Sequence, residues 1–441
     1  MTKLRAIVLT IVEHLTQCVE DEFAALGGTL EQGGLAAIEG RLEALRDRFS
    51  RALLDGIGKA LGNGRHANRL SCDCGGHLTY VADRRKDVLT TLGWLTLHRA
   101  YFRCKGCNAT RFPLDEALDI VGEGQSMGVQ LMVTLVCALL PNGQAMRLLD
   151  ELKLPSVSIK ESQRITHDVG SEAVALDAET ARRWSEDHTP PADHVRSQPP
   201  ERLAVLMDGT TAHTDGDWHE VKVGTFYTFN EEGKATGEKA CVSTFEGVEH
   251  FRSLWDTEAQ RWCMAEAPRV VALCDGAPWT WNTVAEYCPP HTVERLDFYH
   301  ANEHLWEMAR ALWGESAPRA KEWVEQQKTR LLEGELDAFF DELTRWTAHE
   351  DYAEAALKQL GYFETNRTRL GYAEARARGE PIGSGMVEAA CKTIVCVREK
   401  QPGMRWTKTN ANVIAHLRCL YFSNRWHSFK RYMTTLVRKA A

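Results

Sequence analysis

Long apolar runs are missing from this sequence. No stretch approaches the roughly 18 uncharged apolar residues that a membrane-spanning helix needs, so we expect no membrane partner. The start of the chain is partly apolar, but Glu13 and His14 interrupt the run, a pattern typical of an amphipathic helix rather than a signal peptide. We therefore expect a protein that works in the cytoplasm.

An even set of cysteines and an internal repeat are missing as well. The chain has 13 cysteines and no export signal, which favours reduced thiols or metal ligands over a disulfide framework. No repeat or long low-complexity tract divides the chain. Its 441 residues exceed a typical domain of about 100–200 residues, so we expect several modules.

An overall excess of positive charge is also missing. The formal net charge of −8 argues, taken alone, against a nucleic-acid partner. The distribution argues the other way, because residues 392–441 hold eleven Lys or Arg against one acid, and residues 65–111 hold nine against three. Local patches determine where a polyanion binds, so the pattern favours nucleic-acid contact over merely solvated basic faces.

The residue pattern changes several times along the chain. Helical spacing at the start, with breaks at Gly27-Gly28 and Gly33-Gly34, gives way to short alternating strands and then to helices that begin near Ser126 and Ser158. These later helices suit a helix-turn-helix and a generic helical bundle equally well. The predicted segments are an N-terminal helical segment (1–62), a zinc-ribbon-like β module (63–115), a helical, helix-turn-helix-like DNA-binding module (116–184), a polar, proline-rich linker (185–200), an α/β core in two parts (201–300 and 376–410), an all-helical insertion (301–375) and basic C-terminal helices (411–441).

Four cysteines are spaced as two metal-binding knuckles. Cys104 and Cys107 form a C-x-x-C, and Cys72 and Cys74 form a tighter C-x-C about 30 residues earlier. Such knuckles can hold one tetrahedral Zn²⁺ through four thiolates, which leaves no open position for catalysis. We expect a structural zinc that stabilises a module with little core of its own. The alternative is a metal-free remnant of a ribbon, because Ser71 stands where the usual spacing would place a cysteine.

Two predicted strands, 202–207 and 269–274, end in the same way. RLAVLMDG ends at Asp208-Gly209, and RVVALCDG ends at Asp275-Gly276. Strands that are apolar on both faces lie in the middle of a covered sheet, so adjacent strands would present the two carboxylates side by side. Like charges held together are costly unless a cation such as Mg²⁺ or Mn²⁺ neutralises them. Ordinary turns are the alternative for either Asp-Gly alone.

A third acid lies far downstream. Glu388 follows the Gly-Ser-Gly of PIGSGMVEAACK by one helical turn and shares a helix face with Lys392. Two strand-end aspartates and a late helical glutamate are the components of a site that holds two Mg²⁺ or Mn²⁺ ions for phosphoryl transfer. Residues suited to phosphate contact follow directly, and the predicted DNA-binding set is Lys392, Arg398, Lys400, Arg405 and Trp406.

These motifs carry a family resemblance. The set LMDGT, LCDGA, LDFYHANEHL and PIGSGMVEAACKTIVCVREKQPGMRW resembles bacterial insertion-sequence transposases of the DDE type, above all the ISKra-type family and more distantly Mutator-like enzymes. The resemblance extends from the cysteine knuckles to the C-terminus. It implies an RNase H-like catalytic core with Asp208, Asp275 and Glu388 as metal ligands, interrupted by the helical insertion. It also implies a protein that is associated with the nucleoid and binds double-stranded DNA, both the terminal inverted repeats and the target. The active complex would be a homo-oligomer.

The box Asp297-Phe298-Tyr299-His300 has two interpretations. Asp297, His300 and His304 could form a metal site on one helix face, or Asp297 could cap the insertion helix while His300 supports the active site from below. We favour the supporting role. The whole pattern predicts a Mg²⁺-dependent transposase that nicks element ends and transfers the freed 3′-hydroxyl to target DNA. The alternatives are a transposase-derived DNA-binding protein without catalysis and an RNase H-like nuclease that cuts branched DNA.

Overall fold

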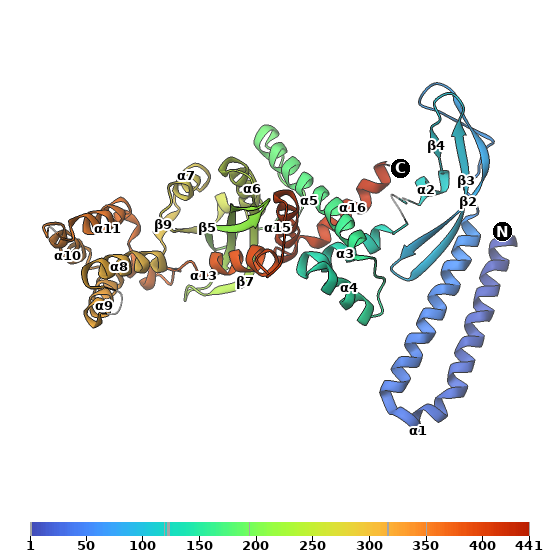
Figure 1. Cartoon of the computed structure of the whole chain (residues 1–441), viewed down its shortest axis with the longest axis horizontal. Helices are drawn as coiled ribbons and strands as arrows, with labels where there is room; N and C mark the ends of the chain where they lie inside the picture. Colours follow the sequence, from blue (N-terminus) through green and yellow to red (C-terminus); the bar gives the residue numbers. More distant parts are fainter. Residues whose placement is uncertain are drawn as a thin grey trace. The chain divides into compact units, whose positions relative to one another are not determined.

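A computed structural model describes residues 2–440, apart from residues 119, 121–123, 194, 315–316 and 350. The protein is a mixed α/β chain that forms two compact units (Figure 1). The first unit is residues 1–169 with 430–441, and the second is residues 170–429. Within the described part of the chain, no helix is long and apolar enough to cross a membrane.

The first unit begins with a helical hairpin. Helix α1 (Thr2–Leu61) turns at Gly34, whose φ of 60° and ψ of −146° lie outside the helical region and suit a residue without Cβ. Of the two predicted breaks only this one is present, because the backbone stays helical through Gly27-Gly28. Glu22 of the first arm pairs with Arg41 and Arg48 of the second arm.

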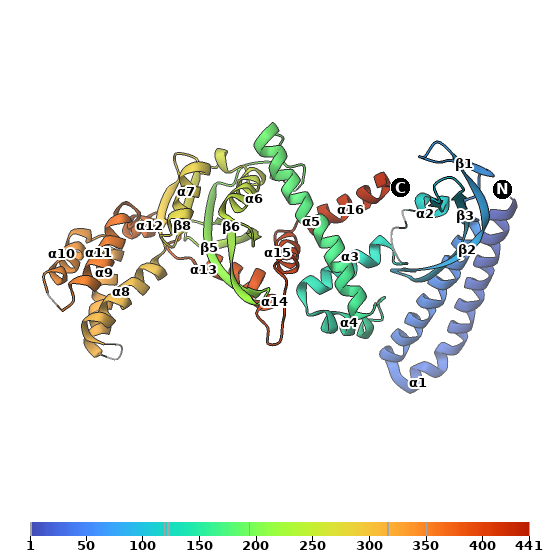
Figure 2. The ribbon, with the colours of Figure 1, turned by 45° about the horizontal axis from the view of Figure 1, so that its top comes forward.

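A four-stranded antiparallel sheet follows, as predicted for residues 63–115 (Figure 2). Its core is a long hairpin in which Thr90 pairs with Gly93, so that only Thr91 and Leu92 form the loop. The strands run in the order β1-β2-β3-β4. The elements are β1 (Arg69–Ser71), β2 (His77–Thr90), β3 (Gly93–Cys104), β4 (Thr110–Arg111) and the short helix α2 (Pro113–Ala117).

Three helices come next, and the first and the third start near their predicted residues. Ser126 accepts a hydrogen bond from the N–H of Val129 at the start of α3, and Ser158 accepts one from Glu161 at the start of α5. The helices are α3 (Met127–Leu139), α4 (Asn142–Glu151) and α5 (Ile159–Asp187). The boundary between the two units lies inside α5, at residues 169–170, and not in the predicted linker.

The second unit is built on a five-stranded sheet of order β7-β6-β5-β8-β9. β5, β6 and β7 pair antiparallel, whereas β8 is parallel to β5, and β9 is parallel to β8. The strands are β5 (Arg202–Thr214), β6 (Asp217–Phe229), β7 (Ala235–Thr244), β8 (Arg269–Cys274) and β9 (Val293–Leu296). β5 and β8 begin where the sequence pattern placed them, and β5 is longer than expected; β9 was not predicted.

Both faces of this sheet are covered. Alternate residues of β5 enter different cores: Leu203, Val205 and Met207 face one, and Ala204 and Leu206 face the other. All five are at most 1% exposed. This two-sided burial is the reason that β5 reads as an unbroken apolar run.

Different helices cover the two faces. The first core is completed by α6 (Val248–Arg261), the 3₁₀ turn η1 (Met264–Glu266), α7 (Pro278–Tyr287) and the insertion helices. The second is completed by α13 (Gly385–Ala390), the π-helix η3 (Cys391–Cys396) and α15 (Lys408–Phe422). The short α14 (Val397–Glu399) follows the π-helix, and α16 (Trp426–Ala440) ends the chain.

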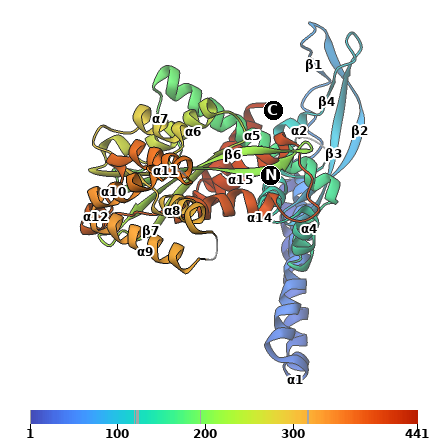
Figure 3. The same cartoon turned by 60° about the vertical axis from the view of Figure 1, so that its left-hand side comes forward.

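The segment 301–375 is helical in all its regular elements among the described residues, and it extends forward in the view of Figure 3. Trp323 is 6% exposed and packs edge-on against Trp313. The elements are α8 (Phe298–Trp313), α9 (Pro318–Glu333), α10 (Leu336–Thr347), α11 (Ala353–Thr365), η2 (Arg367–Arg369) and α12 (Tyr372–Ala377).

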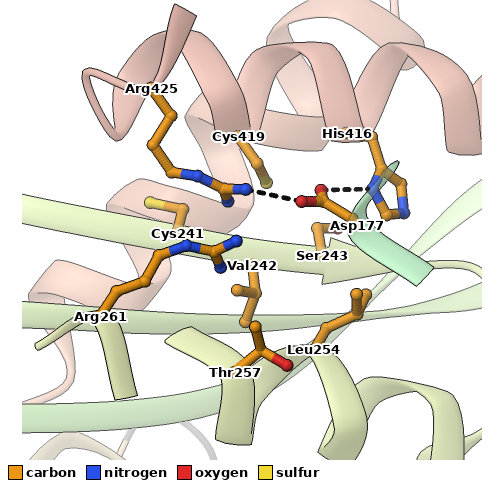
Figure 4. Close-up of a pocket in the computed structure, with 10 residues that line it drawn as sticks. All are labelled: Asp177, Cys241, Val242, Ser243, Leu254, Thr257, Arg261, His416, Cys419 and Arg425. Atoms are coloured by element: carbon orange, nitrogen blue, oxygen red, sulfur yellow. Dashed lines mark hydrogen bonds and ion pairs between the residues drawn. The ribbon is translucent and has the colours of Figure 1, made fainter. Parts of the chain in front are cut away.

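Buried charges join distant segments of the second unit (Figure 4). Asp177 of α5 accepts a hydrogen bond from Arg425 at 2.6 Å, and its other oxygen lies 3.3 Å from Nδ1 of His416. Arg261 of α6 lines the same cavity, whose volume is about 10 Å³. A cavity of this size holds about one water molecule at most, so the ion pairs are almost fully desolvated.

The predicted linker 185–200 takes part in this cluster. Asp193 pairs with Arg261 at 2.9 Å and with Arg425 at 3.0 Å. Residues 185–187 also belong to α5. The predicted linker therefore does not separate the two units, because ion pairs with two buried arginines hold Asp193 within the second unit.

Replacing Asp177 by alanine tests the cluster. Asp177→Ala should lower the free energy of unfolding by about 3–5 kcal/mol, because Arg425 stays buried with one counter-charge fewer. Glu179→Ala is the matched control, since Glu179 lies on the same helix and pairs with Arg182 on the surface. Urea unfolding at pH 7 measures both variants, and equal losses would contradict the role of the cluster.

Candidate functional site

The four predicted cysteines converge in the first unit. Sγ of Cys72 lies 3.5 Å from Sγ of Cys107 and 3.5 Å from that of Cys74, and Sγ of Cys74 lies 3.7 Å from that of Cys104. All four sulfurs lie within 4.8 Å of one another. Among the described residues they are the only group of three or more Cys, His, Asp or Glu ligand atoms this close.

The sulfur spacing fits a tetrahedral zinc ion. With Zn–S bonds of about 2.3 Å, the edges of a regular tetrahedron are about 3.8 Å long. The short C-x-C spacing is accommodated by a tight turn, in which the N–H of Gly75 bonds to the carbonyl of Cys72 at 2.9 Å and Gly75 has a φ of +80°. The backbone N–H groups of Cys107 and Gly106 lower the pKa of Cys104 to about 6. A thiolate ligand is therefore available at neutral pH.

The two aspartates lie side by side in the second unit. β5 and β8 pair in parallel with Met207 opposite Cys274, so Asp208 and Asp275 follow at the same level of the sheet. Burial raises the pKa of Asp208, and the negative charge of Asp275 raises it further. The hydrogen bond from the N–H of Gly209 lowers this pKa, but the net shift is upward. Sγ of Cys391 lies 3.6 Å from Oδ2 of Asp208. Both carboxylates are half-buried.

Only one of the two Asp-Gly pairs ends a strand. Asp275 follows the last residue of β8, as predicted. Asp208 does not end β5, because Gly209 pairs with Lys222 and the β5–β6 ladder continues to Thr214. The carboxylate of Asp208 is thus carried by a rigid hairpin beyond the point where the sheet loses β8.

Asp297 is the most fully satisfied acid near this pair. Its side chain is buried and accepts hydrogen bonds from the N–H of Ser384 at 2.6 Å, the N–H of His300 at 2.9 Å and Nδ1 of His300 at 2.7 Å. Burial alone would raise the pKa of Asp297, but these bonds outweigh it and lower the pKa. Asp297 caps α8, as the supporting interpretation predicts.

His300 carries a positive charge beside the aspartates. The hydrogen bond to Asp297 raises the pKa of His300 to about 9, although burial lowers it. The negative charge of Asp275 adds to the upward shift. His304 lies apart, with its Nδ1 2.7 Å from Oε1 of Gln359 and its ring stacked on Tyr362. Asp297, His300 and His304 therefore do not form the metal site that was the alternative interpretation of this box.

Glu388 does not close around the aspartates in this structure. It is exposed on α13 and accepts a hydrogen bond of 2.5 Å from the hydroxyl of Ser384. Within the described residues, Asp208, Asp275 and Glu388 are not a set whose ligand atoms come within 4.8 Å of one another. Ser384 instead links Glu388 to Asp297, and the sequence offered only its place in the Gly-Ser-Gly break as a signal for this role.

The predicted DNA-binding residues separate into two kinds. Lys392, Lys400 and Arg405 are exposed and accessible to phosphate. Arg398 is 1% exposed and lies 4.8 Å from the ring centre of Trp406, whose Nε1 donates to the carbonyl of Glu399. The prediction that Arg398 contacts DNA is wrong, because its guanidinium packs inside the second unit. Trp406 is half-buried and has a structural contact as well.

Two contacts to the aspartates were not predicted. Cys391 approaches Asp208 from the π-helix, and the hydroxyl of Tyr362 donates to the backbone carbonyl of Asp275 at 2.9 Å. Neither has a local sequence signal, because both side chains come from segments far from the strand that they touch.

The cysteine cluster predicts a measurable metal content. Purified protein should hold one zinc ion per chain, as measured by inductively coupled plasma mass spectrometry. Cys104→Ser should hold less than about half of that amount and should melt at a lower temperature, because three thiolates bind zinc more weakly than four. Cys263→Ser is the control, since Cys263 is a half-buried thiol of the second unit. Zinc-free wild-type protein with an unchanged melting temperature would contradict the site.

The Asp297–His300 pair predicts a pH-dependent stability. The pKa of His300 is about 9 in the folded protein and exceeds the unfolded value of about 6.5. The ion pair with Asp297 therefore stabilises the fold fully below pH 6.5, and this stabilisation is lost as the pH rises through 9. Relative to His300→Gln, the wild type should lose unfolding free energy over this interval. Urea unfolding at several pH values measures it, and a constant difference between the two proteins would refute the assignment.

Comparison with known proteins leaves the family open. No protein-family model matches this chain, and no curated protein matches its sequence.

Proposed function

We propose that this protein is a DNA transposase, with an RNase H-like core that cleaves element ends and joins them to target DNA. The observation that carries the proposal is the register of β5 and β8, which brings Asp208 and Asp275 to the same level of a mixed sheet. This is the arrangement expected of a carboxylate pair that binds divalent cations. The motif resemblance described above supplies the family.

The charge at this point of the sheet supports the cation requirement. Burial and the negative charge of Asp275 both disfavour the ionised form of Asp208, and a divalent cation would relieve both effects. Asp208, Asp275 and Glu388 would hold two Mg²⁺ or Mn²⁺ ions, which supply activation of the attacking oxygen and stabilisation of the leaving oxygen. The register of β5 and β8 supports this role for Asp208 and Asp275. Glu388 requires a shift away from Ser384.

The residues around the pair have supporting roles in this proposal. Asp297 holds His300 at the start of α8 and Ser384 at the start of α13, and so positions both sides of the site. The exposed Lys392, Lys400 and Arg405 would contact backbone phosphate of double-stranded DNA. The zinc module and the helices of residues 116–184 would recognise the terminal inverted repeats, within a homo-oligomeric complex.

One observation favours a second candidate, a transposase-derived DNA-binding protein without catalysis. Glu388 hydrogen-bonds to Ser384, and among the described residues its ligand atoms do not lie within 4.8 Å of those of both Asp208 and Asp275. A protein that has lost catalysis would keep this arrangement with DNA bound, whereas an active enzyme would bring Glu388 to the metal ions.

Cleavage of DNA that carries an element end tests the proposal. With Mg²⁺, wild-type protein should nick a duplex taken from the borders of the element, and Asp208→Ala should be slower by more than about a hundredfold, the order lost with one preorganised charged group. Asp217→Ala is the matched control, because Asp217 is an exposed aspartate at the β5–β6 turn.

The outcomes separate the candidates. Equal cleavage by wild type and Asp208→Ala would refute the site. Binding of the element ends without cleavage by the wild type would favour the non-catalytic protein. Cleavage of branched DNA regardless of terminal sequence would favour a structure-specific nuclease.

A further inference from the structure

We propose that a groove beside the candidate site binds a single DNA strand, with one base stacked on Tyr299 and a phosphate at Arg376. This inference rests on the proposed function and names how its substrate is held. The groove has a volume of about 570 Å³ and lies in the second unit. The lining residues used in the argument are Tyr227, Gly233, Tyr299, Arg376, Gly383 and Met386.

Close backbone packing builds one wall of the groove. The turn between β6 and β7 lies against residues 379–380: a Cβ on Gly379 would lie 1.6 Å from the carbonyl oxygen of Glu231, and one on Gly233 would lie 3.2 Å from the carbonyl carbon of Glu380. Both glycines have positive φ, of +59° and +76°. The two segments could not approach this closely with larger residues, so the wall is rigid.

Tyr299 offers an exposed aromatic ring on a fixed backbone. Its side chain is 58% exposed although it belongs to the first turn of α8, which Asp297 caps. The ring packs against Gly383, where a Cβ would lie 2.6 Å from a ring carbon. An exposed, positioned ring beside a groove is a stacking platform for a nucleic-acid base.

The groove adjoins the candidate catalytic residues along the chain. Tyr299 directly precedes His300, and Gly383 and Gly385 flank Ser384, which bonds to both Asp297 and Glu388. The groove and the candidate site therefore share two segments of the chain, residues 297–300 and 383–388.

The charges of the groove suit a phosphate. Its two acidic lining residues are already paired, Glu380 with Arg269 and Arg295, and Glu232 with Lys234. Arg376 is exposed and, among the described residues, its guanidinium has neither an ion pair nor a hydrogen bond. Among the lining residues this leaves one unpaired positive charge, in the same groove as the ring of Tyr299.

The dimensions favour a single strand over a duplex. The volume lies within the range of about 300–1,000 Å³ that is typical of small-ligand sites, which accommodates a nucleotide but not both strands of a helix. Stacking on an aromatic ring and contact between a cation and the backbone are the two elements of sequence-tolerant single-strand binding.

Binding of fluorescein-labelled dT20, followed by anisotropy in EDTA, tests the groove without any cleavage. Tyr299→Ala should weaken binding by about five- to a hundredfold, the range for loss of one stacked base, and Tyr299→Phe should retain the affinity of the wild type. Tyr421→Ala is the control, because Tyr421 is an exposed tyrosine of α15 outside the groove. Arg376→Gln should weaken binding and reduce its dependence on salt.

Failure of this proposal differs from failure of the proposed function. Wild-type protein that does not bind dT20, or equal affinities for Tyr299→Ala and Tyr299→Phe, would overturn the groove proposal whatever the cleavage assay shows. Selective loss of binding by Tyr299→Ala, together with equal cleavage by wild type and Asp208→Ala, would support the groove and refute the transposase site.

Discussion

The parallel pairing of β5 with β8 is the constraint on which the second unit depends. It sets Met207 opposite Cys274 and therefore brings two aspartates, 67 residues apart in the chain, to one level of the sheet. Both strands are almost completely buried on their two faces, so a slip of one residue would move each side chain from one packed core into the other, where its shape does not fit. The same burial that stabilises the sheet thus fixes the position of the carboxylates.

Asp297 provides the second link, between parts of the core that the insertion separates. It accepts hydrogen bonds from His300 before the insertion and from Ser384 after it. A buried carboxylate without such donors would be costly, so its three hydrogen bonds hold the two ends of the insertion together. The candidate site and the groove beside Tyr299 both lie along this junction, which joins the chemistry and the DNA contact proposed here.

Much of the architecture follows local patterns that the sequence displays. The start of α3 at Ser126, the strands 202–207 and 269–274, and the helical character of 301–375 were predictable from capping residues and periodicity. The cysteine cluster followed from spacing, and the turn at Gly75 accommodates the short Cys72-x-Cys74 spacing. Strand β9 was missed because four residues between a turn and a helix carry too little periodicity.

Residue identity and spacing determined which groups are available: two Asp-Gly strands, a late glutamate, four thiols and a basic C-terminal segment. Tertiary structure decided which of them meet. Register places Asp208 beside Asp275, and burial removes Arg398 from the surface. Ion pairs join Asp193 to Arg261 and Arg425, and Glu388 hydrogen-bonds to Ser384. The reason is physical: these outcomes depend on partners far away in the chain, and local sequence patterns carry no information about non-local contacts.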